Sequence, residues 1–308
     1  MSRSFPLRWP ALAAALLAFA LAPAHATVRV LACEPEWGAL AQELGGKLVD
    51  VAVATTALQD PHQIQAKPSL IARARNADLV ACTGAELEIG WLPVLLQQSG
   101  NGKVQPGQPG NFAAADFVRK LDVPTQLDRA QGDVHAAGNP HIQTDPRNIA
   151  LVADALATRL QQIDPSNAAQ YAQLHADFAK KWQAAIARWS AQAAPLRGTA
   201  VVSQHKAFVY LYDWLGMKEV AVLEPKPGVE PSAAHLQSVL TTLKSAPAKM
   251  VLLAAYQDSR PSEWIAKNAG IAVVKVPFTV GGSDAAKDLF GLFDDTVARL
   301  LAGAGAKP

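Results

Sequence analysis

Short apolar runs alternate with helical patterns along the first part of the chain, from Thr27 to about residue 100. Runs typical of buried strands are followed by segments with apolar positions spaced by three or four. The expected strands lie at 28–33, 48–54 and 77–82, and the expected helices at 35–44, 68–76 and 86–98. Strands of this length alternating with helices predict right-handed βαβ units around a parallel sheet.

The same alternation returns after residue 198. The expected strands lie at 199–203, 220–223, 250–255 and 271–276, and the expected helices at 208–215, 232–244, 262–268 and 285–301. The chain therefore belongs to the α/β class, with two lobes, each a parallel sheet flanked by helices.

The segment between the two lobes contains few helix breakers. We expect one helix at 148–162 and, after a restart at Asp164-Pro165-Ser166, a helix of about seven to eight turns at 167–194. The apolar stripe of this long helix predicts core packing; it comprises Tyr171, Leu174, Phe178, Trp182, Ile186 and Trp189. A stiff helix joining two lobes would resist large hinge closure.

These patterns predict the domain organisation. We expect an N-terminal lobe at 27–165, a linking helix at 166–194 and a C-terminal lobe at 195–308. The stretch from Gly100 to Gly138 is rich in Gly, Pro, Gln and Asp, and we expect it to form a long surface excursion.

Residues 1–26 have the pattern of a secretory signal peptide. Arg3 and Arg8 precede an apolar run at 11–22, and Ala24-His25-Ala26 gives a typical cleavage site. A membrane anchor is the alternative, but the run is shorter than the roughly 18 apolar residues that a spanning helix requires. We expect a mature chain that begins at Thr27 and is secreted to an oxidising compartment such as the periplasm.

Charge gives no support for nucleic-acid binding. The net charge of +2 falls to zero once residues 1–26, which hold two arginines and no acid, are removed. A neutral chain lacks the basic surface that captures nucleic acid, so we expect no such partner.

Three histidines, His62, His141 and His205, share one kind of setting. Each follows an expected strand or lies in the loop that leads into a helix, the edge at which open α/β sheets bind ligands. Three neutral imidazoles suit Zn²⁺, with a fourth position for water or an oxygen donor. Their separation of roughly 60 to 80 residues does not establish convergence, so scattered loop histidines remain the alternative.

Four motifs in the same order resemble those of the cluster A-I substrate-binding proteins of ABC importers, in particular the zinc-binding periplasmic type. The motifs are "DPHQIQAKPS" from Asp60, "GNPHIQTDPRN" from Gly138, "HKAFVYLYDWLGM" from His205 and "EPKPGVEPSAAHL" from Glu224. The resemblance implies two α/β lobes joined by a long helix. It also implies a metal ion captured between the lobes and delivered to an inner-membrane ABC permease.

The resemblance implies that His62, His141 and His205 are the metal ligands. Manganese-binding members of this family usually have a carboxylate at the position of His205, and a nitrogen-rich site favours zinc over the harder Mn²⁺. We therefore expect Zn²⁺ as the transported ion, with Mn²⁺ or another divalent metal as the alternative. A three-histidine zinc hydrolase is a further alternative, although no H-E-x-x-H arrangement provides a general base. We expect no catalysis and a monomer.

The chain departs from the family pattern at three places. Gln143 stands where the second motif usually has tryptophan, and the segment 126–138 offers only His135, Asp128 and Asp133 in place of a His-rich loop, so we expect His135 to be a surface residue. No acid follows the last expected strand. Asp284 is the nearest acid, but we expect it to cap the final helix and water to be the fourth ligand.

Several other residues have two readings. Asp60 and Asp145 flank the expected ligands and could accept an imidazole N–H, while Asp145 before Pro146 could equally cap a helix. Glu86 and Glu88 are expected to begin a helix. Cys33 and Cys82 end strands that are neighbours in this family's sheet, and either a disulfide or two buried thiols is compatible with the sequence.

Overall fold

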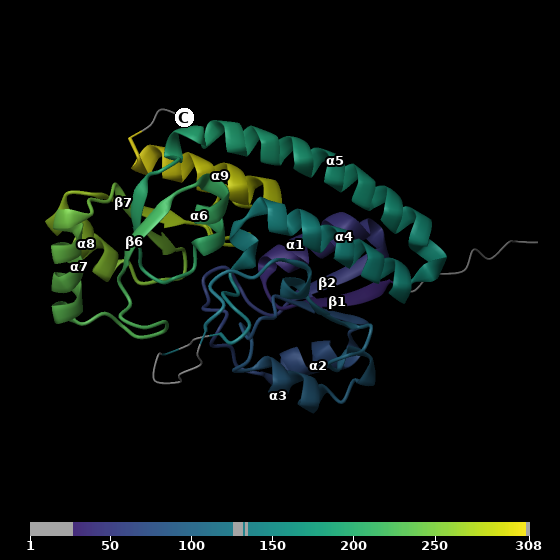
Figure 1. Cartoon of the computed structure of the whole chain (residues 1–308). Coiled ribbons are helices and arrows are strands. Elements are labelled where there is room, and N and C mark those ends of the chain that lie inside the picture. Colours follow the sequence, from purple (N-terminus) through teal and green to yellow (C-terminus); the bar gives the residue numbers. More distant parts are fainter. Residues whose placement is uncertain (1–26, 126–131, 133–134, 306–308) are drawn as a thin grey trace, which may run out of the picture.

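The protein consists of two α/β lobes bridged by long helices (Figure 1). The computed structural model describes residues 27–125, 132 and 135–305. Each lobe holds a four-stranded sheet whose strand pairs are all parallel, in the order β2-β1-β3-β4 in the first lobe and β6-β5-β7-β8 in the second. The expected fold class is therefore confirmed.

The N-terminal sheet buries both of its faces. Its strands are β1 (Val28–Ala32), β2 (Val49–Val53), β3 (Leu79–Cys82) and β4 (Asn111–Ala113), and its helices are α1 (Pro35–Gly45), α2 (Pro68–Asn76) and α3 (Leu92–Ser99). Successive strand residues point to opposite faces. Val30 and Ala32 therefore join the core beneath α1, while Leu31 and Cys33 join the core formed with α2 and α3.

The C-terminal sheet is built in the same way. Its strands are β5 (Ala200–Ser203), β6 (Lys218–Val222), β7 (Met250–Ala254) and β8 (Ala272–Val276), and its helices are α6 (Val209–Leu215), α7 (Ala233–Ser245), α8 (Arg260–Ala269) and α9 (Leu289–Gly303). Val202 and Val251 pack towards α7 and α8, whereas Val201 and Leu252 pack towards α6 and α9.

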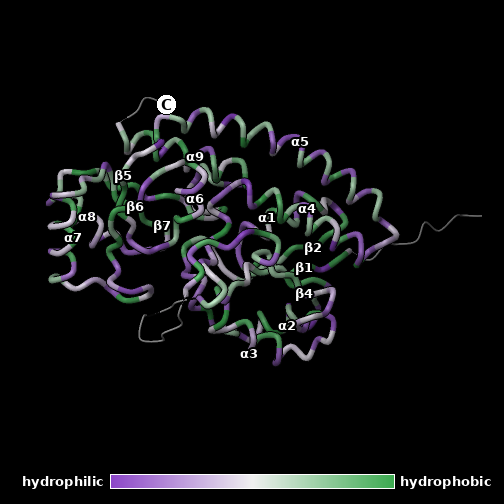
Figure 2. Tube along the Cα trace, in the orientation of Figure 1, coloured by the Kyte–Doolittle hydropathy of each residue, from purple (hydrophilic) through white to green (hydrophobic). Residues whose placement is uncertain are grey.

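Helix α4 (Pro146–Ile163) packs in the first lobe, and helix α5 (Ala168–Gln192) runs from it to the second lobe. Helix α5 alternates between hydrophobic and hydrophilic residues along its length, as an amphipathic helix does (Figure 2). Its aromatic stripe packs on α9: the ring centroid of Trp182 lies 5.0 Å from that of Phe290 and 5.6 Å from that of Phe293. One hydrophobic core consequently runs from α1 through α5 to α9 without interruption.

Two helices begin later than their sequence patterns indicate. Gly84, Ala85 and Glu86 have φ values of +76°, +49° and +67°, which no helix accommodates, so α3 begins at Leu92 instead of near Glu86. The last helix begins at Leu289, and Asp288, not Asp284, is its N-cap, because its side chain accepts a hydrogen bond from the amide of Gly291 at 2.7 Å.

Part of the described stretch between Gly100 and residue 125 belongs to the first sheet and not to a surface excursion. It contributes strand β4, which pairs with β3 through Phe112 and so extends the sheet. Three residues are too few for a recognisable alternation of apolar and polar positions, so this strand has no signal in the sequence.

Cys33 and Cys82 form a disulfide that links the carboxyl ends of β1 and β3, with their Cα atoms 4.7 Å apart. The structure thus decides between the two alternatives that the sequence leaves open. The expected signal peptide at 1–26 lies outside the described residues. Within the described residues, no helix has the length and apolar character needed to cross a membrane.

Candidate metal-binding site

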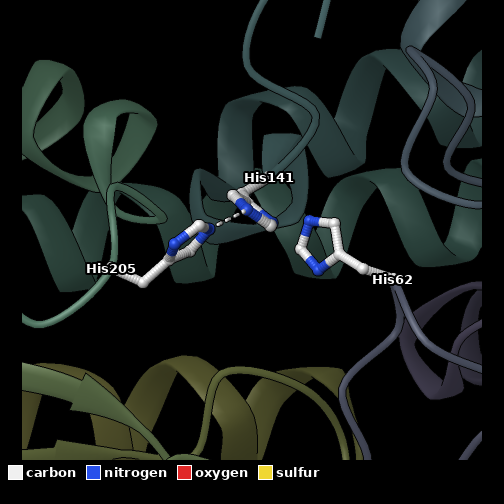
Figure 3. A group of neighbouring side chains, drawn as sticks. All are labelled: His62, His141 and His205. Carbon is white, nitrogen blue, oxygen red and sulfur yellow. Dashed lines mark hydrogen bonds between the residues drawn. The ribbon is translucent and has the colours of Figure 1, made fainter. Parts of the chain in front are cut away.

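Three loops that meet between the lobes bring His62, His141 and His205 together (Figure 3). His62 lies in the turn between β2 and α2, His141 lies directly before the 3-10 turn Ile142–Thr144 that leads into α4, and His205 follows β5. Parallel strands end at one edge of their sheet, so the loops beyond them converge where two such edges face each other.

The three imidazole rings surround one point. One ring nitrogen from each histidine lies within 4.8 Å of those of the others, and the Nε2 atoms of His141 and His205 are 3.2 Å apart. The ring centroids are 5.3–5.8 Å apart, and each pair of rings is close to perpendicular. The rings point towards one another in Figure 3. This arrangement presents several nitrogen lone pairs to one small volume.

Carboxylates orient two of the three rings. Asp60 Oδ1 lies 2.7 Å from Nδ1 of His62, and Glu224 Oε2 lies 2.7 Å from Nδ1 of His205. Each carboxylate accepts a hydrogen bond from the Nδ1–H of its ring, which leaves the lone pair of the neutral ring on Nε2. Burial opposes ionisation of Asp60, but the hydrogen bonds from the side chain and amide of His62 outweigh it and lower the pKa of this carboxyl.

His141 is the most deeply buried of the three, with 1% of its surface exposed. Burial lowers its pKa well below 6.5, and the neighbouring His205, His62 and His135 lower it further. Nδ1 of His141 and Nε2 of His62 are buried without a hydrogen-bond partner among the described residues. Buried polar atoms seldom lack a partner, so these nitrogens indicate a site built for a ligand.

His135 also lies at this site, so the expectation of a surface histidine is wrong. It is partly buried, and its ring stacks on that of His62 with centroids 5.5 Å apart and planes 30° apart. It lines a cavity of about 350 Å³ together with His141, His205 and Lys206. The single histidine in this loop gave no periodic signal from which this placement could be predicted.

The two aspartates beside the expected ligands have different roles. Asp60 Oδ1 lies within hydrogen-bond distance of Nδ1 of His62, in the role that its place in the sequence predicts. Asp145 instead caps α4. Its carboxylate accepts a hydrogen bond from the amide of Arg147 at 2.8 Å and also forms an ion pair with the guanidinium of Arg147. Asp145 therefore acts on the helix and not on His141.

The loop after β8 contributes an aromatic ring in place of an acid. Phe278 packs edge-on against His141, with ring centroids 5.5 Å apart, and its φ of +69° is rare for a non-glycine residue. Thr279 donates a hydrogen bond to Glu36 in the other lobe. Asp284 is exposed. The described part of this loop offers no carboxylate to the three histidines.

Two features of the site do not appear among the sequence predictions. The first is the hydrogen bond between Glu224 and His205, although a carboxylate just beyond β6, the strand beside β5, is a recognisable signal for such a partner. The other feature is a cluster of three buried acids, Glu34, Glu36 and Glu88, beneath the site. Acids spread over about 50 residues have no common pattern in the sequence.

The acid cluster is held by hydroxyl and amide donors. Thr83 donates its hydroxyl to Glu34 at 3.0 Å and its amide to Glu88 at 2.7 Å. Burial raises the pKa of all three carboxyls, to about 7 for Glu36 and Glu88 and well above the usual value for Glu34. Gln143 lies near this cluster, 2% exposed, with its Oε1 atom lacking a partner among the described residues.

Comparison with known proteins places the chain in a family. Residues 30–303 match the family described as "Zinc-uptake complex component A periplasmic". The high-affinity zinc uptake system protein ZnuA of Paracoccus denitrificans is 26% identical over 260 residues, covering 73% of this chain and 76% of that protein. The manganese ABC transporter substrate-binding lipoprotein PsaA of Streptococcus pneumoniae is 24% identical over 226 residues, covering 72% and 70%.

Solved structures share the fold. A crystal structure of ZnuA superposes with a TM-score of 0.74 at 22% identity, covering 91% of this chain and all of that one. A Mn-bound periplasmic metal-binding protein from Candidatus Liberibacter asiaticus gives a TM-score of 0.73 at 19% identity, covering 89% and 98%. The motifs, the two-lobe fold and the family match agree: the chain belongs to the cluster A-I metal-binding substrate-binding proteins of ABC importers, within the family of the periplasmic component A of zinc uptake.

Proposed function

We propose that this protein captures Zn²⁺ between its lobes through His62, His141 and His205 and delivers it to an inner-membrane ABC permease. The observation that carries the proposal is the convergence of three ring nitrogens within 4.8 Å, two of them on rings oriented by carboxylates. Imidazoles oriented in this way are typical zinc ligands, because the partner carboxylate fixes the tautomer and raises the basicity of the ligating nitrogen.

The donor set favours zinc over manganese. Both kinds of ion occur in the names of related proteins, zinc in ZnuA and manganese in PsaA. Neutral nitrogen donors suit Zn²⁺, whereas Mn²⁺ prefers carboxylate and water oxygens. The nearest acids, Asp60 and Glu224, are hydrogen-bonded to the Nδ1 atoms of His62 and His205. They therefore lie on the opposite side of each ring from the proposed ligating nitrogen, Nε2.

The site's position suits capture and release. His62 lies in the N-terminal lobe and His205 in the C-terminal lobe, so a bound ion would bridge the two. An open cavity of about 350 Å³ borders His141 and His205 and gives a route from solvent. We place the protein in the periplasm as a monomer, after cleavage of residues 1–26, which N-terminal sequencing of the exported protein would test.

Elemental analysis and competitive metal titration test the proposed site. We expect one zinc per purified chain, zinc bound more tightly than manganese, and loss of binding in His62→Ala, His141→Ala and His205→Ala. His175→Ala is a matched control, because this histidine also pairs with an aspartate, Asp154 at 2.8 Å, but on the exposed surface of α5. Wild-type zinc stoichiometry and affinity in all three site variants would refute the proposal.

Proton competition gives a second test. Zinc binds only the neutral imidazole, so acidification weakens binding once the histidines protonate. Burial holds the pKa of His141 well below 6.5, so this ring stays neutral below that pH. We expect weaker zinc binding at about pH 5 than at about pH 8. Equal affinity at both pH values in equilibrium dialysis would argue against histidine ligation.

A further inference from the structure

We propose that His135 supplies a fourth nitrogen ligand, so that the bound ion is held by four histidines instead of three histidines and water. This inference rests on the proposed zinc site and extends it. It concerns a residue whose loop has no other histidine within the segment 126–138. Four nitrogen donors complete the tetrahedral shell that Zn²⁺ adopts in closed sites.

Other candidate donors around the site are engaged elsewhere. Phe278 fills the position beside His141 on the C-terminal side, and the hydroxyl of Thr279 is directed to Glu36. Tyr256 packs against Phe278, and its burial, with Asp60 and Glu224 nearby, raises its pKa well above 10, which keeps the phenol protonated and a weak ligand. The side of the site left for a fourth donor is the one facing the cavity.

His135 lies on that side. Its ring stacks on His62 and lines the same cavity as His141 and His205. The three inner histidines form the tight set, and His135 lies just outside it. Its ring runs alongside that of His62, so we expect a turn of its side chain to bring a nitrogen towards the ion. The cavity supplies the room for that rotation.

The backbone around His135 is fixed in place above the site. The amide of Ala136 donates to Glu86 Oε2 at 2.6 Å, and the amide of Gly138 donates to the carbonyl of His135 at 3.1 Å. Asn139 donates hydrogen bonds to both lobes: its amide to the carbonyl of Leu121 at 2.8 Å, and its side-chain Nδ2 to the carbonyl of Lys206 at 2.7 Å. Glu86 is therefore a positioning residue that holds His135 over the cavity.

A fourth nitrogen would increase selectivity for zinc. Replacing a water oxygen by imidazole favours Zn²⁺ and disfavours Mn²⁺, which prefers oxygen donors. The described part of the loop after β8 offers no carboxylate to the three histidines. His135 would thus supply a nitrogen ligand from the N-terminal lobe in the position otherwise left to water.

X-ray absorption spectroscopy of the zinc-loaded full-length mature protein tests the ligand number directly. We expect four imidazoles in the wild type, and three imidazoles with one oxygen in His135→Ala. The visible spectrum of the Co²⁺-loaded protein should change in the same variant. Three imidazoles and an oxygen in the wild type, with no change in His135→Ala, would overturn the inference while leaving the three-histidine site standing.

Affinity measurements distinguish the proposed ligand, His135, from Glu86, the residue that positions it. Competition with a chelator should give a zinc Kd that is about 10- to 100-fold higher for His135→Ala, and a smaller increase for Glu86→Ala. The ratio of the manganese Kd to the zinc Kd should decrease in both variants. His235→Ala is the control, since His235 lies on α7 and bonds the carbonyl of Val222. Unchanged affinity and preference in His135→Ala would contradict the inference, whereas wild-type zinc affinity in all three variants His62→Ala, His141→Ala and His205→Ala would contradict the proposed function itself.

Discussion

At the scale of single residues, the site is defined by two carboxylate–imidazole pairs. Asp60 also accepts a hydrogen bond from the amide of His62 at 3.0 Å, and Glu224 accepts one from the amide of Gly228 at 2.9 Å. Each carboxylate is therefore fixed before it orients its ring. Such orientation lowers the entropy that a ligand loses when it binds a metal, and it raises the basicity of the opposite nitrogen.

Removing the charge of either carboxylate should weaken zinc binding without removing a ligand. We expect Asp60→Asn and Glu224→Gln each to raise the zinc Kd by about 10- to 100-fold, because the ring loses its fixed tautomer. Competitive chelator titration measures the change. Asp154→Asn, which removes the equivalent partner of His175, is the control and should leave the Kd unaltered. A Kd within error of wild type in both site variants would show that these pairs do not tune the ligands.

The buried acids form a second feature at this scale. Glu36 is 1% exposed and accepts a hydrogen bond from Thr279 across the lobes. Burial raises its pKa from 4.5 to about 7, partly offset by that hydrogen bond. A carboxyl whose pKa is raised by folding stabilises the folded state below its unfolded pKa, and that contribution is lost as pH rises through the folded pKa.

The metal-free protein should therefore lose stability between pH 4.5 and about 7 in part through Glu36. We expect the free energy of unfolding of Glu36→Gln to decrease less over this range than that of the wild type, although Glu34 and Glu88 still contribute. Urea denaturation at several pH values measures the slope. Glu263→Gln is matched, because Glu263 also accepts a hydroxyl bond, from Ser259 at 2.6 Å, but on the surface. Parallel slopes for wild type and Glu36→Gln would contradict the assignment.

At the scale of secondary-structure elements, α5 determines how the lobes are joined. Trp182 is fully buried, and its indole N–H donates to the carbonyl of Pro146, the first residue of α4, at 2.8 Å. The same ring contacts Phe178, Trp189 and Phe290. The aromatic stripe thus fixes α5 against α4 and α9 at one point. The Cys33–Cys82 disulfide plays a comparable part within the first sheet, where it joins β1 to β3.

Truncating Trp182 should destabilise the whole protein. We expect Trp182→Ala to lower the free energy of unfolding by about 3–5 kcal/mol, because a large buried ring and a buried hydrogen bond are lost together. Chemical denaturation monitored by circular dichroism measures the loss. Lys181→Ala, one residue away on the exposed face of α5, should change stability little. A loss below about 1 kcal/mol for Trp182→Ala would mean that the surrounding side chains refill the space.

At the scale of the whole molecule, the two lobes share one hydrophobic core. That core includes residues of β1 and α1 in the first lobe, of α5, and of β5 and α9 in the second. Hinge closure requires a few loop residues that absorb a rotation, and a continuous packed core resists such a movement. Helix α5 also runs over both lobes in Figure 1, along α4 of the first lobe and along α9 of the second.

Zinc should therefore bind with little change in overall shape. We expect small-angle X-ray scattering to give the same radius of gyration for the metal-free and zinc-loaded protein, because closure of the lobes would disrupt the shared core. Loop movements around His135 would leave this quantity unchanged. A clear contraction on adding zinc, absent in His141→Ala, would indicate hinge closure and contradict the expectation.

Much of the fold follows from the sequence. The alternation of apolar runs with helical patterns predicts, within two residues, seven of the eight strands found in the described part of the chain, and the aromatic stripe predicts the buried face of α5. The predicted starts of α3 and α9 were wrong. Residues with positive φ precede α3, and a loop occupies the first residues of the pattern that predicted α9, so both helices begin later than their patterns indicate. Strand β4 was missed because it is only three residues long.

For the site, local patterns were enough to name the candidates: three histidines in loops beyond strands, each in a motif of a known family, with Asp60 beside the first. Contacts between distant segments were needed to establish that the rings converge, that Glu224 orients His205, that Asp145 caps α4, and that His135 lines the cavity. The physical reason is that these contacts join segments far apart along the chain. Local sequence patterns report which face of an element is buried, whereas packing between elements determines which loops meet.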